Sequence, residues 1–397
     1  MDPQDNAPVT YIDTPRGLSR WVKVLEKADE IGVDTEGDSM HHYRERVCLI
    51  QMTAMGQDVI IDPLALPDLS SLTDVFADDQ KIKIFHDACY DLIGLRRDFG
   101  FEVAGIFDTM LACRFLGYAR FGLAAQLKEC FDHEADKRFQ RSDWTRRPLS
   151  EEQITYARYD THYLPALRAH LSESLEKAGR LAWAEEDFTR LPEQTRSMAG
   201  RAIGEDLDRG FWRVRGVKAL LPIQKGRVQK LHALRDAVAQ ALDRPPFRVI
   251  SDMVMLQLAM DPPKTPDDIA PRRGLSRTLM DRYRQDVFDV ITQAEPLYGK
   301  PPQGSGRRRV GRPSDPELRS RFDKLRDLRR KVASGLGLDP EVLLGNAALD
   351  ILTRKPPTSM DDLKSRLDLG IWRQPLLAVP IVECFRQTEV PQTTEES

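Results

Sequence analysis

The 397-residue sequence predicts an α/β domain followed by two all-α helical modules. Two observations lead to this fold class. The first third of the chain alternates strand-like and helix-like patterns, and the last half repeats one helical pattern at a constant offset. The chain is also too long for one compact domain. With 41% hydrophobic and 30% charged residues, its composition is that of a globular protein.

The α/β domain is assigned to residues 1–190 on the order of its predicted elements. Runs rich in Val, Ile and Leu and bounded by Gly, Asp or Pro predict strands at 30–35, 46–53, 58–62 and 81–85. Helical patterns follow at 87–99, 108–117, 122–130 and 150–178. The last helix starts with Ser150, followed three residues later by Gln153, which is the pattern of a capping box.

The two helical modules are predicted from an internal repeat. The segment that begins at Leu234 matches the segment that begins at Leu328 without a gap, at an offset of 94 residues. Both copies read L-R-x-x-V-A and later P-P followed by D-D, which indicates two copies of one helical unit. We assign the following parts: a first module at 210–295, a linker rich in Pro, Gly and Arg at 296–316, a second module at 317–388 and a flexible tail at 389–397.

Charge is divided unequally along the chain. Residues 1–190 carry 23 Lys and Arg against 34 Asp and Glu, a net charge of −11, whereas the remainder carries a net charge of +8. This division favours carboxylates that gather cations in the first part and basic residues that hold a polyanion in the second. The five cysteines show no C-x-x-C spacing, so neither a disulfide framework nor a zinc site is indicated. Because no apolar stretch approaches a membrane span or a signal peptide, we expect a cytoplasmic protein without a membrane partner.

Three acidic clusters stand out in the α/β domain. Asp34 and Glu36 lie two residues apart at the end of an apolar strand, so both side chains point to one face. Asp91 lies on the helix that follows the strand at 81–85. Tyr156 and Asp160 are four residues apart on a helix and share one of its faces.

Such carboxylates indicate a particular chemistry if they converge. They would resist ionisation unless cations neutralised them, and oxygen ligands favour Mg²⁺ or Mn²⁺ over softer metals. Two such ions can activate water and stabilise the leaving oxygen in phosphodiester hydrolysis. Since a tyrosine with a normal pKa of about 10 is a poor base at neutral pH, we expect Tyr156 to orient the attacking water.

Taken together, these motifs resemble a known family. D-T-E at residues 34–36, then H-D-x-x-x-D, then Y-x-x-x-D look like the three exonuclease motifs of the DEDD superfamily, in its tyrosine-bearing branch. F-D-T-M-L-A-C-R-F-L-G and W-x-x-R-P-L-S at residues 144–150 are similar to the ribonuclease D family in particular. Members of that family carry two HRDC modules after the exonuclease domain, and the internal repeat extends the resemblance to the helical half.

The resemblance implies a ribonuclease-H-like exonuclease domain followed by two HRDC-like modules. It also implies 3′–5′ hydrolysis of RNA with two divalent metal ions, Mg²⁺ or Mn²⁺, and release of 5′-mononucleotides. It places the metal-site carboxylates at Asp34, Glu36, Asp91 and Asp160, with Tyr156 near the attacking water. Asp34 would bridge both ions, and Asp91 would act mainly through bound water. The expected substrates are tRNA precursors or other small structured RNAs, and no obligate protein partner is indicated.

Two other functions stay open. A 3′–5′ DNA exonuclease uses the same motifs, although the chain lacks the G-x-x-x-x-G-K-[ST] nucleotide-binding motif of helicase-linked nucleases. A non-catalytic RNA-binding adaptor would have lost its nuclease site, whereas all four carboxylates and the tyrosine are present at matching positions.

Several neighbouring residues have more than one interpretation. We interpret His86 as a hydrogen-bonded histidine at a strand end and Asp87 as a surface carboxylate. Asp108 matches a recurrent position of the fold but equally fits a helix cap. The segment 41–46 follows Gly37, where many relatives have a bulky apolar residue, and could contact RNA or form an ordinary polar loop.

In the helical half, Trp212 and Trp372 are predicted to be core residues.

Overall fold

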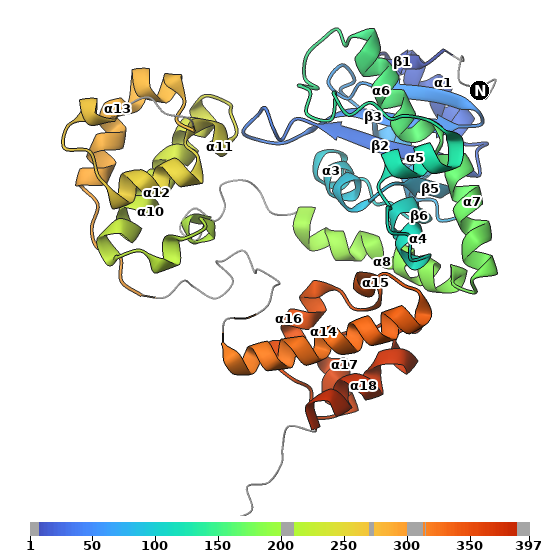
Figure 1. The fold of residues 1–397 in the computed structure, drawn as a ribbon. Coiled ribbons are helices and arrows are strands. Elements are labelled where there is room, and N and C mark those ends of the chain that lie inside the picture. The colour runs from blue at the N-terminus through green and yellow to red at the C-terminus, as the bar shows by residue number, and fades with distance from the viewer. Residues whose placement is uncertain (1–7, 200–209, 270–273, 300–312, 314, 387–397) are drawn as a thin grey trace, which may run out of the picture.

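The computed structural model describes residues 8–199, 210–269, 274–299, 313 and 315–386. Residues 8–199 form an α/β domain, helices α10 to α13 form the first helical module, and helices α14 to α18 form the second (Figure 1). The predicted fold class is confirmed. Most of the predicted linker and the whole predicted tail fall outside the described residues, and the domain boundaries stay predictions.

A six-stranded mixed sheet forms the centre of the α/β domain, with the strand order β1-β4-β3-β2-β5-β6. β3 pairs antiparallel with both β2 and β4, whereas β1 is parallel to β4, and β5 is parallel to β2 and β6. The strands are β1 Thr10–Ile12, β2 Glu30–Gly37, β3 Val47–Ala54, β4 Gln57–Ile61, β5 Ile82–Phe85 and β6 Ile106–Asp108. The four strands predicted from the sequence are confirmed. β1 and β6 were missed because three residues are too few to show an alternating pattern.

Helices cover both faces of this sheet. α1 (Pro15–Leu25) and α3 (Cys89–Phe99) share one hydrophobic core with β2 and β3. α6 (Glu151–His162) and α7 (Leu164–Lys177) pack over the opposite face. The remaining helical elements of the domain are η2 Ser70–Leu72, α2 Thr73–Ala77, α4 Thr109–Phe115, α5 Leu123–Phe131 and α8 Leu181–Ala199.

One predicted helix in this domain was wrong. The single helix expected at 150–178 is two helices, which end and begin on either side of Tyr163. Pro165 lies in the first turn of α7, and because a proline has no N–H to donate and its ring clashes with the carbonyl group four residues earlier, α6 cannot continue through it. Helix α8 runs from Leu181 to Ala199, across residue 190, where we predicted the end of the domain.

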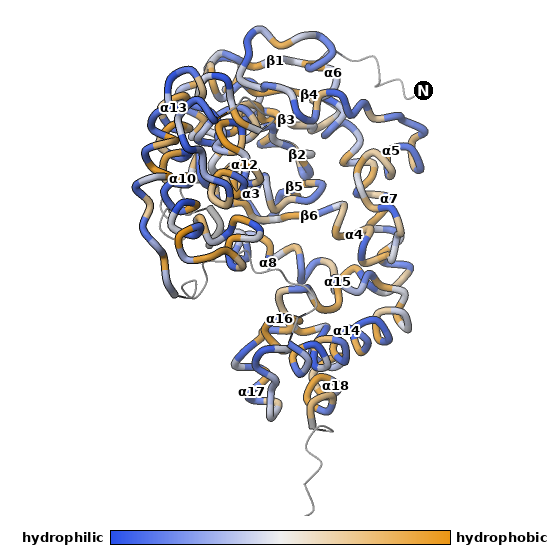
Figure 2. Tube along the Cα trace, turned by 60° about the vertical axis from the view of Figure 1, so that its left-hand side comes forward, coloured by the Kyte–Doolittle hydropathy of each residue, from blue (hydrophilic) through white to orange (hydrophobic). Residues whose placement is uncertain are grey.

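The two helical modules are built from equivalent elements, as the repeat predicted. The first contains η3 Phe211–Arg213, η4 Val217–Ala219, α10 Pro222–Ala241, α11 Pro246–Val249, α12 Asp252–Met260, η5 Pro266–Asp268 and α13 Arg277–Thr292. The second contains α14 Pro316–Leu336, α15 Pro340–Leu343, α16 Asn346–Arg354, α17 Met360–Arg366 and α18 Gln374–Arg386. Figure 2 shows hydrophobic and hydrophilic segments alternating along α14, whereas α18 is predominantly hydrophobic.

One arginine of the repeat makes the same hydrogen bond in both modules. Arg235 Nη1 donates to the carbonyl oxygen of Ile250 at 3.3 Å, and Arg329 Nη1 donates to that of Leu344 at 3.0 Å. Both pairs are related by the offset of 94 residues. Trp212 and Trp372 are each 6% exposed, as predicted for core residues.

The structure agrees with the prediction that the cysteines form no disulfide framework. All five cysteines are free. Among the described residues, no helix is long and apolar enough to cross a membrane.

Candidate active site

Three of the predicted carboxylates meet between the sheet and helix α6. Asp34 and Glu36 lie on β2, and Asp160 lies on α6. One carboxylate oxygen from each residue lies within 4.8 Å of the other two. All three side chains are partly buried, so the cluster is neither sealed in the core nor free on the surface. The structure thus brings together residues that are more than 120 positions apart in the sequence.

Asp91 approaches this cluster from the other side of β2. It lies in the first turn of α3, is 5% exposed, and accepts a hydrogen bond from the hydroxyl of Thr35 at 2.7 Å. It does not belong to the group of three that lies within 4.8 Å. Its charge nevertheless reaches the cluster, because it raises the pKa of Asp34, Glu36 and Asp160.

All four carboxyl groups resist ionisation. Burial is the largest cause, and repulsion from the neighbouring carboxylates adds to it, so that the pKa values of Asp34 and Glu36 rise well above the ordinary range. Burial raises the pKa of Asp91 to about 7, although the hydrogen bond from Thr35 opposes the rise. Burial and the charge of Asp91 raise the pKa of Asp160 to about 8.

These residues fit a site for divalent cations. They offer only hard oxygen ligands, which suit Mg²⁺ or Mn²⁺. Asp160 Oδ2 is buried and has no hydrogen-bond partner, so one cluster residue has a ligand-capable oxygen that is left unsatisfied. A bound cation would satisfy this oxygen and remove the repulsion that keeps the carboxylates protonated.

Tyr156 lies on the same face of α6 as Asp160, one turn earlier. Its ring packs against Trp144, with ring centroids 5.9 Å apart, and against Phe139 at 6.0 Å. Burial first, and then the charges of Asp160 and Glu36, raise the pKa of the phenol above its ordinary value. A raised pKa favours the protonated phenol in the metal-free chain, which suits a hydrogen-bond role for Tyr156.

Helix α6 is fixed over the sheet by buried polar contacts. Asp58 Oδ2, on β4, accepts from Arg158 Nε at 2.6 Å and lies 2.7 Å from His162 Nδ1. The hydroxyls of Thr53 and Thr161 lie 2.8 Å apart between β3 and α6. These contacts fix α6 in the orientation that brings Asp160 to the carboxylates of β2.

The amino-terminal end of α6 and one glycine of β2 complete this arrangement. Ser150 and Gln153 form the capping box predicted from the sequence. Gly32 allows the close approach of the helix, since a Cβ atom there would lie 3.0 Å from the carbonyl oxygen of Thr161.

Sequence reasoning missed the residues that anchor α6. Asp58 and Arg158 read as ordinary polar positions, because a buried ion pair between distant residues leaves no periodic signal. One feature of the sequence could have indicated this anchor. Arg158 lies two residues after Tyr156 on the same predicted helix, and its side chain is on the side of the helix that faces the sheet.

Three neighbouring residues match their simpler interpretation. His86 Nδ1 lies 2.9 Å from the hydroxyl of Thr109, and burial lowers its pKa to about 4. Asp87 is exposed. Asp108 is the N-cap of α4 and accepts from the backbone nitrogens of Leu111 and Ala88, at 2.9 Å each. None of the three belongs to the carboxylate cluster.

Segment 41–46 contacts the first helical module, which was not predicted from the sequence. Tyr43 is 4% exposed and lies in the hydrophobic core of the first helical module, where its hydroxyl donates to Asp236 Oδ2 at 2.8 Å. His42 Nδ1 lies 2.7 Å from Asp243 Oδ2. The segment therefore attaches the module to the strand that carries Asp34 and Glu36.

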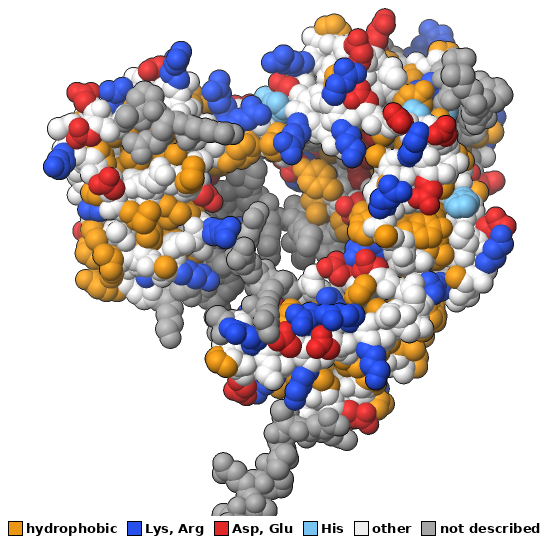
Figure 3. All heavy atoms as spheres, viewed as in Figure 1, with side chains coloured by type: hydrophobic (Ala, Val, Ile, Leu, Met, Phe, Trp, Pro, Cys, Tyr) orange, Lys and Arg blue, Asp and Glu red, His pale blue; other side chains and the backbone are white. Residues whose placement is uncertain are grey.

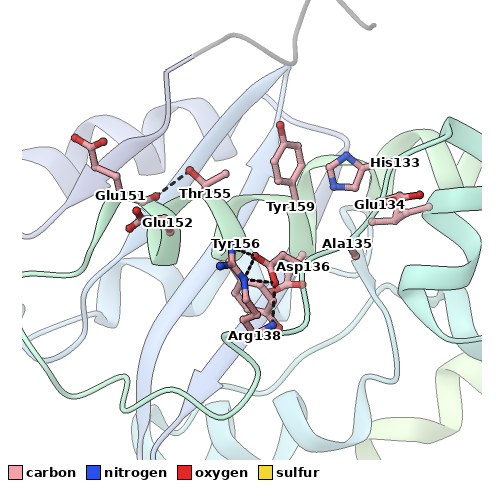
Figure 4. Close-up of a pocket in the computed structure, with 12 residues that line it drawn as sticks. His133, Glu134, Ala135, Asp136, Arg138, Glu151, Glu152, Thr155, Tyr156 and Tyr159 are labelled. Atoms are coloured by element: carbon pink, nitrogen blue, oxygen red, sulfur yellow. Dashed lines mark hydrogen bonds and ion pairs between the residues drawn. The ribbon is translucent and has the colours of Figure 1, made fainter.

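A cavity of about 420 Å³ opens beside the cluster along α6 (Figure 4). Tyr156 and Asp160 line it together with Tyr159, and the loop after α5 forms its other wall. In this loop, the ring of His133 lies 4.3 Å from that of Tyr159. Apart from Arg138 and His133, the ionisable groups that line the cavity are carboxylates or Tyr side chains, so it is better suited to a base than to a phosphate.

Fold and site define a class of protein: a nuclease with a carboxylate centre and two helical modules. Comparison with known families agrees, since the model described as 3′-5′ exonuclease matches residues 9–176 and the HRDC domain model matches residues 224–291 and 319–372. The chain is also 31% identical to ribonuclease D of Desulfotalea psychrophila over 338 residues, which cover 85% of this chain and 88% of that protein. The chain belongs to the ribonuclease D family and is a 3′–5′ exoribonuclease.

Two further relatives set the limits of this similarity. The exosome complex exonuclease RRP6 of Saccharomyces cerevisiae is 30% identical over 293 residues, but these cover only 39% of that protein. The crystal structure of Escherichia coli RNase D superposes with a TM-score of 0.70 over 96% of this chain and 99% of that chain. At 22% sequence identity, that structure supports the fold. The family implies dependence on divalent metal ions.

Proposed function

We propose that this chain removes nucleotides from the 3′ ends of small structured RNAs, among them tRNA precursors, at a centre formed by Asp34, Glu36, Asp91 and Asp160. The observation that carries the proposal is the approach of three carboxylates within 4.8 Å of one another. Like charges this close are stable only when protonated or when cations neutralise them. In the functional enzyme we expect the carboxylates to be neutralised by bound Mg²⁺ or Mn²⁺.

The chain's own groups have distinct roles in this proposal. Two bound divalent cations would lower the pKa of the attacking water and neutralise the leaving oxygen. We assign to the phenol of Tyr156 the role of holding the water, since burial and the neighbouring carboxylates raise its pKa and favour its protonated form. Thr35 fixes the orientation of Asp91 through the hydrogen bond at 2.7 Å. The product would be a 5′-mononucleotide.

The cavity along α6 suits the terminal nucleoside. Its aromatic wall, Tyr159 and His133, can stack on a base, and its carboxylates can accept hydrogen bonds from exocyclic amino groups. His133→Ala should then raise KM for a short RNA while leaving the affinity for metal unchanged. An unchanged KM would place the terminal base elsewhere.

A structured substrate fits the arrangement of the modules. Figure 3 shows the surface hollowed between the α/β domain and the two helical modules, with lysines and arginines on both sides. Phosphate contacts from such residues weaken as salt increases, so RNA binding should fall steeply with ionic strength. We also propose that the chain acts in the cytoplasm, where tRNA precursors would be its substrates.

Substitution of the cluster tests the function. Asp34→Ala and Asp160→Ala should abolish metal-dependent release of nucleotides from a tRNA with extra 3′ residues. Asp87→Asn is the matched control, because Asp87 is an exposed carboxylate close to Asp91 in the chain but outside the cluster. Full activity of either alanine variant contradicts the proposed centre.

The same assay separates the alternatives. Faster digestion of a DNA strand than of the matched RNA would favour a DNA exonuclease, since the 2′-OH is what distinguishes the two substrates. RNA binding without shortening, in the presence of Mg²⁺ or Mn²⁺, would favour an adaptor.

A further inference from the structure

A buried amide lies next to the carboxylate cluster without a hydrogen-bond partner. Gln51, on β3, is 0% exposed, and neither its Nε2 nor its Oε1 has a partner among the described residues. Burying an unpaired amide destabilises a fold, and nearly all buried polar groups are hydrogen-bonded. A fully buried amide left unpaired at this place therefore requires a physical explanation.

The register of the sheet shows where this amide points. Gln51 is the direct cross-strand partner of Asp34, and such partners point to the same face of a sheet with their Cβ atoms about 4.5–5.5 Å apart. That face is the one covered by α6, because Thr53, two residues further along β3, contacts Thr161 of that helix. The Gln51 side chain is therefore buried between the sheet and α6, beside Asp34.

Its other neighbours in the sheet cannot pair with it. On β4 the partner of Gln51 is Ile60, and two residues earlier on β3 stands Leu49, both apolar. The hydroxyl of Thr53 already bonds to Asp58 Oδ1 and to Thr161 Oγ1, at 2.8 Å each. Among these sheet neighbours, Asp34 is the group left with acceptor capacity, since an ionised carboxylate has about four lone-pair positions.

We propose that Gln51 is a positioning residue for the metal centre: its amide N–H donates to the carboxylate of Asp34 when divalent cations are bound. This inference rests on the metal site given under the proposed function. Groups that hold metal ligands in place through hydrogen bonds typically contribute about 10–100-fold to metal affinity. In the metal-free chain the amide is unpaired, so part of its burial cost is recovered when the cations bind.

Gln51→Met tests the proposal, because methionine is unbranched, similar in size and unable to donate a hydrogen bond. We expect Mn²⁺ affinity, measured by isothermal titration calorimetry, to fall by about 10–100-fold. In EDTA, Tm should stay unchanged or rise by about 2–4 °C, because an unpaired buried amide has been replaced by an apolar group. A merely structural glutamine would show the reverse: a lower Tm and an unchanged affinity.

Gln126→Met is the matched control. Gln126 is also a fully buried glutamine, but it lies on α5 outside the carboxylate cluster, and its Nε2 donates to the carbonyl oxygen of Arg120 at 2.6 Å. This variant should lower Tm and leave Mn²⁺ affinity unchanged. Activity of Gln51→Met should recover when the metal concentration is raised, whereas that of Asp34→Ala should not.

The outcomes separate the two proposals. If the wild-type chain binds no divalent cation, the metal site itself fails, and the role of Gln51 fails with it. If the wild type binds Mn²⁺ and Gln51→Met binds it equally well, only the role of Gln51 is overturned. Should Gln51→Met not fold, Gln51→Leu provides the same measurement, and loss of folding in both variants would identify Gln51 as structural.

Discussion

The two helical modules share a repeat but attach to the α/β domain in different ways. The second module shares a continuous hydrophobic core with it, in which the rings of Trp183 and Trp372 stack at 4.9 Å and 9°. Arg373 adds an ion pair with the buried Asp187. The first module instead receives Tyr43 of the domain into its own core. One module is thus part of the domain's core, whereas the other is held by an inserted side chain.

The same turn of the repeat is used in both attachments. Asp243 and Gly337 are related by the offset of 94 residues, and both have positive φ, at 47° and 62°. In the first module, the Asp243 carboxylate accepts from the backbone nitrogen of Tyr43 at 3.1 Å. In the second, the carbonyl oxygen of Gly337 accepts from Arg180 at 3.1 Å. The same turn of the repeat therefore contacts the α/β domain through a side chain where it carries Asp243 and through its main chain where it carries Gly337.

The largest expected effect follows from the shared core of the second module. Trp372→Ala should cost about 3–5 kcal/mol of unfolding free energy, because it removes a buried aromatic side chain. Hydrogen exchange should then increase both in the second module and in α8. Trp212→Ala, at the same 6% exposure in the first module, should increase exchange in that module alone. If Trp372→Ala leaves α8 protected, the core is not shared.

The attachment of the first module should depend on one hydroxyl. Tyr43→Phe leaves the carboxylate of Asp236, which is 9% exposed, without this donor, at a cost of about 1–3 kcal/mol to docking. Small-angle X-ray scattering should detect a larger radius of gyration.

Tyr11→Phe is the control for that experiment, since it removes a similar bond to Asp62 at 2.5 Å within the α/β domain. Its radius of gyration should match that of the wild type. An unchanged radius for Tyr43→Phe as well would show that other contacts hold the module.

A change in pH should alter the stability contributed by the metal centre and the stability contributed by the docking of the first module in opposite directions. Asp91 and Asp160 have pKa values raised to about 7 and about 8, so between about pH 4 and pH 8 the folded state binds more protons than the unfolded state. Stability of the metal-free chain should therefore fall as pH rises through this window. Calorimetry in EDTA measures it, and Asp160→Asn should flatten the fall.

The docking contact of the first module should instead become more stabilising as pH rises. A hydrogen bond with His42 lowers the pKa of Asp243, so its contribution is present above the ordinary aspartate pKa and is lost as pH falls below it. A Tm that does not change between pH 4 and pH 8 in EDTA would contradict the raised values at the metal centre.

We expect the smallest effect when Asp243 is replaced by glycine, the residue at the equivalent position of the second module. Asp243→Gly removes the acceptor for His42 and Tyr43 but relieves an aspartate from positive φ, a change in backbone energy of about 1 kcal/mol or less. The module should stay folded, while the radius of gyration increases as for Tyr43→Phe. A variant that is compact and as well docked as the wild type would assign the attachment to Asp236 alone.

The sequence by itself determined the fold class, the repeat and the pairs within each motif. Strand alternation placed Asp34 and Glu36 on one face, and helical spacing did the same for Tyr156 and Asp160, because both periods are local properties of the backbone. The capping box at Ser150 was readable for the same reason. Short strands such as β1 carried too few residues to show a period.

Only the tertiary structure decided what lies between these elements. The anchoring of α6 by Asp58 and Arg158, the unpaired Gln51 beside Asp34, and the insertion of Tyr43 into the first module each join residues that are distant in the chain. Such contacts depend on which surfaces pack together, and packing follows from the summed shape and burial of many side chains instead of any single spacing.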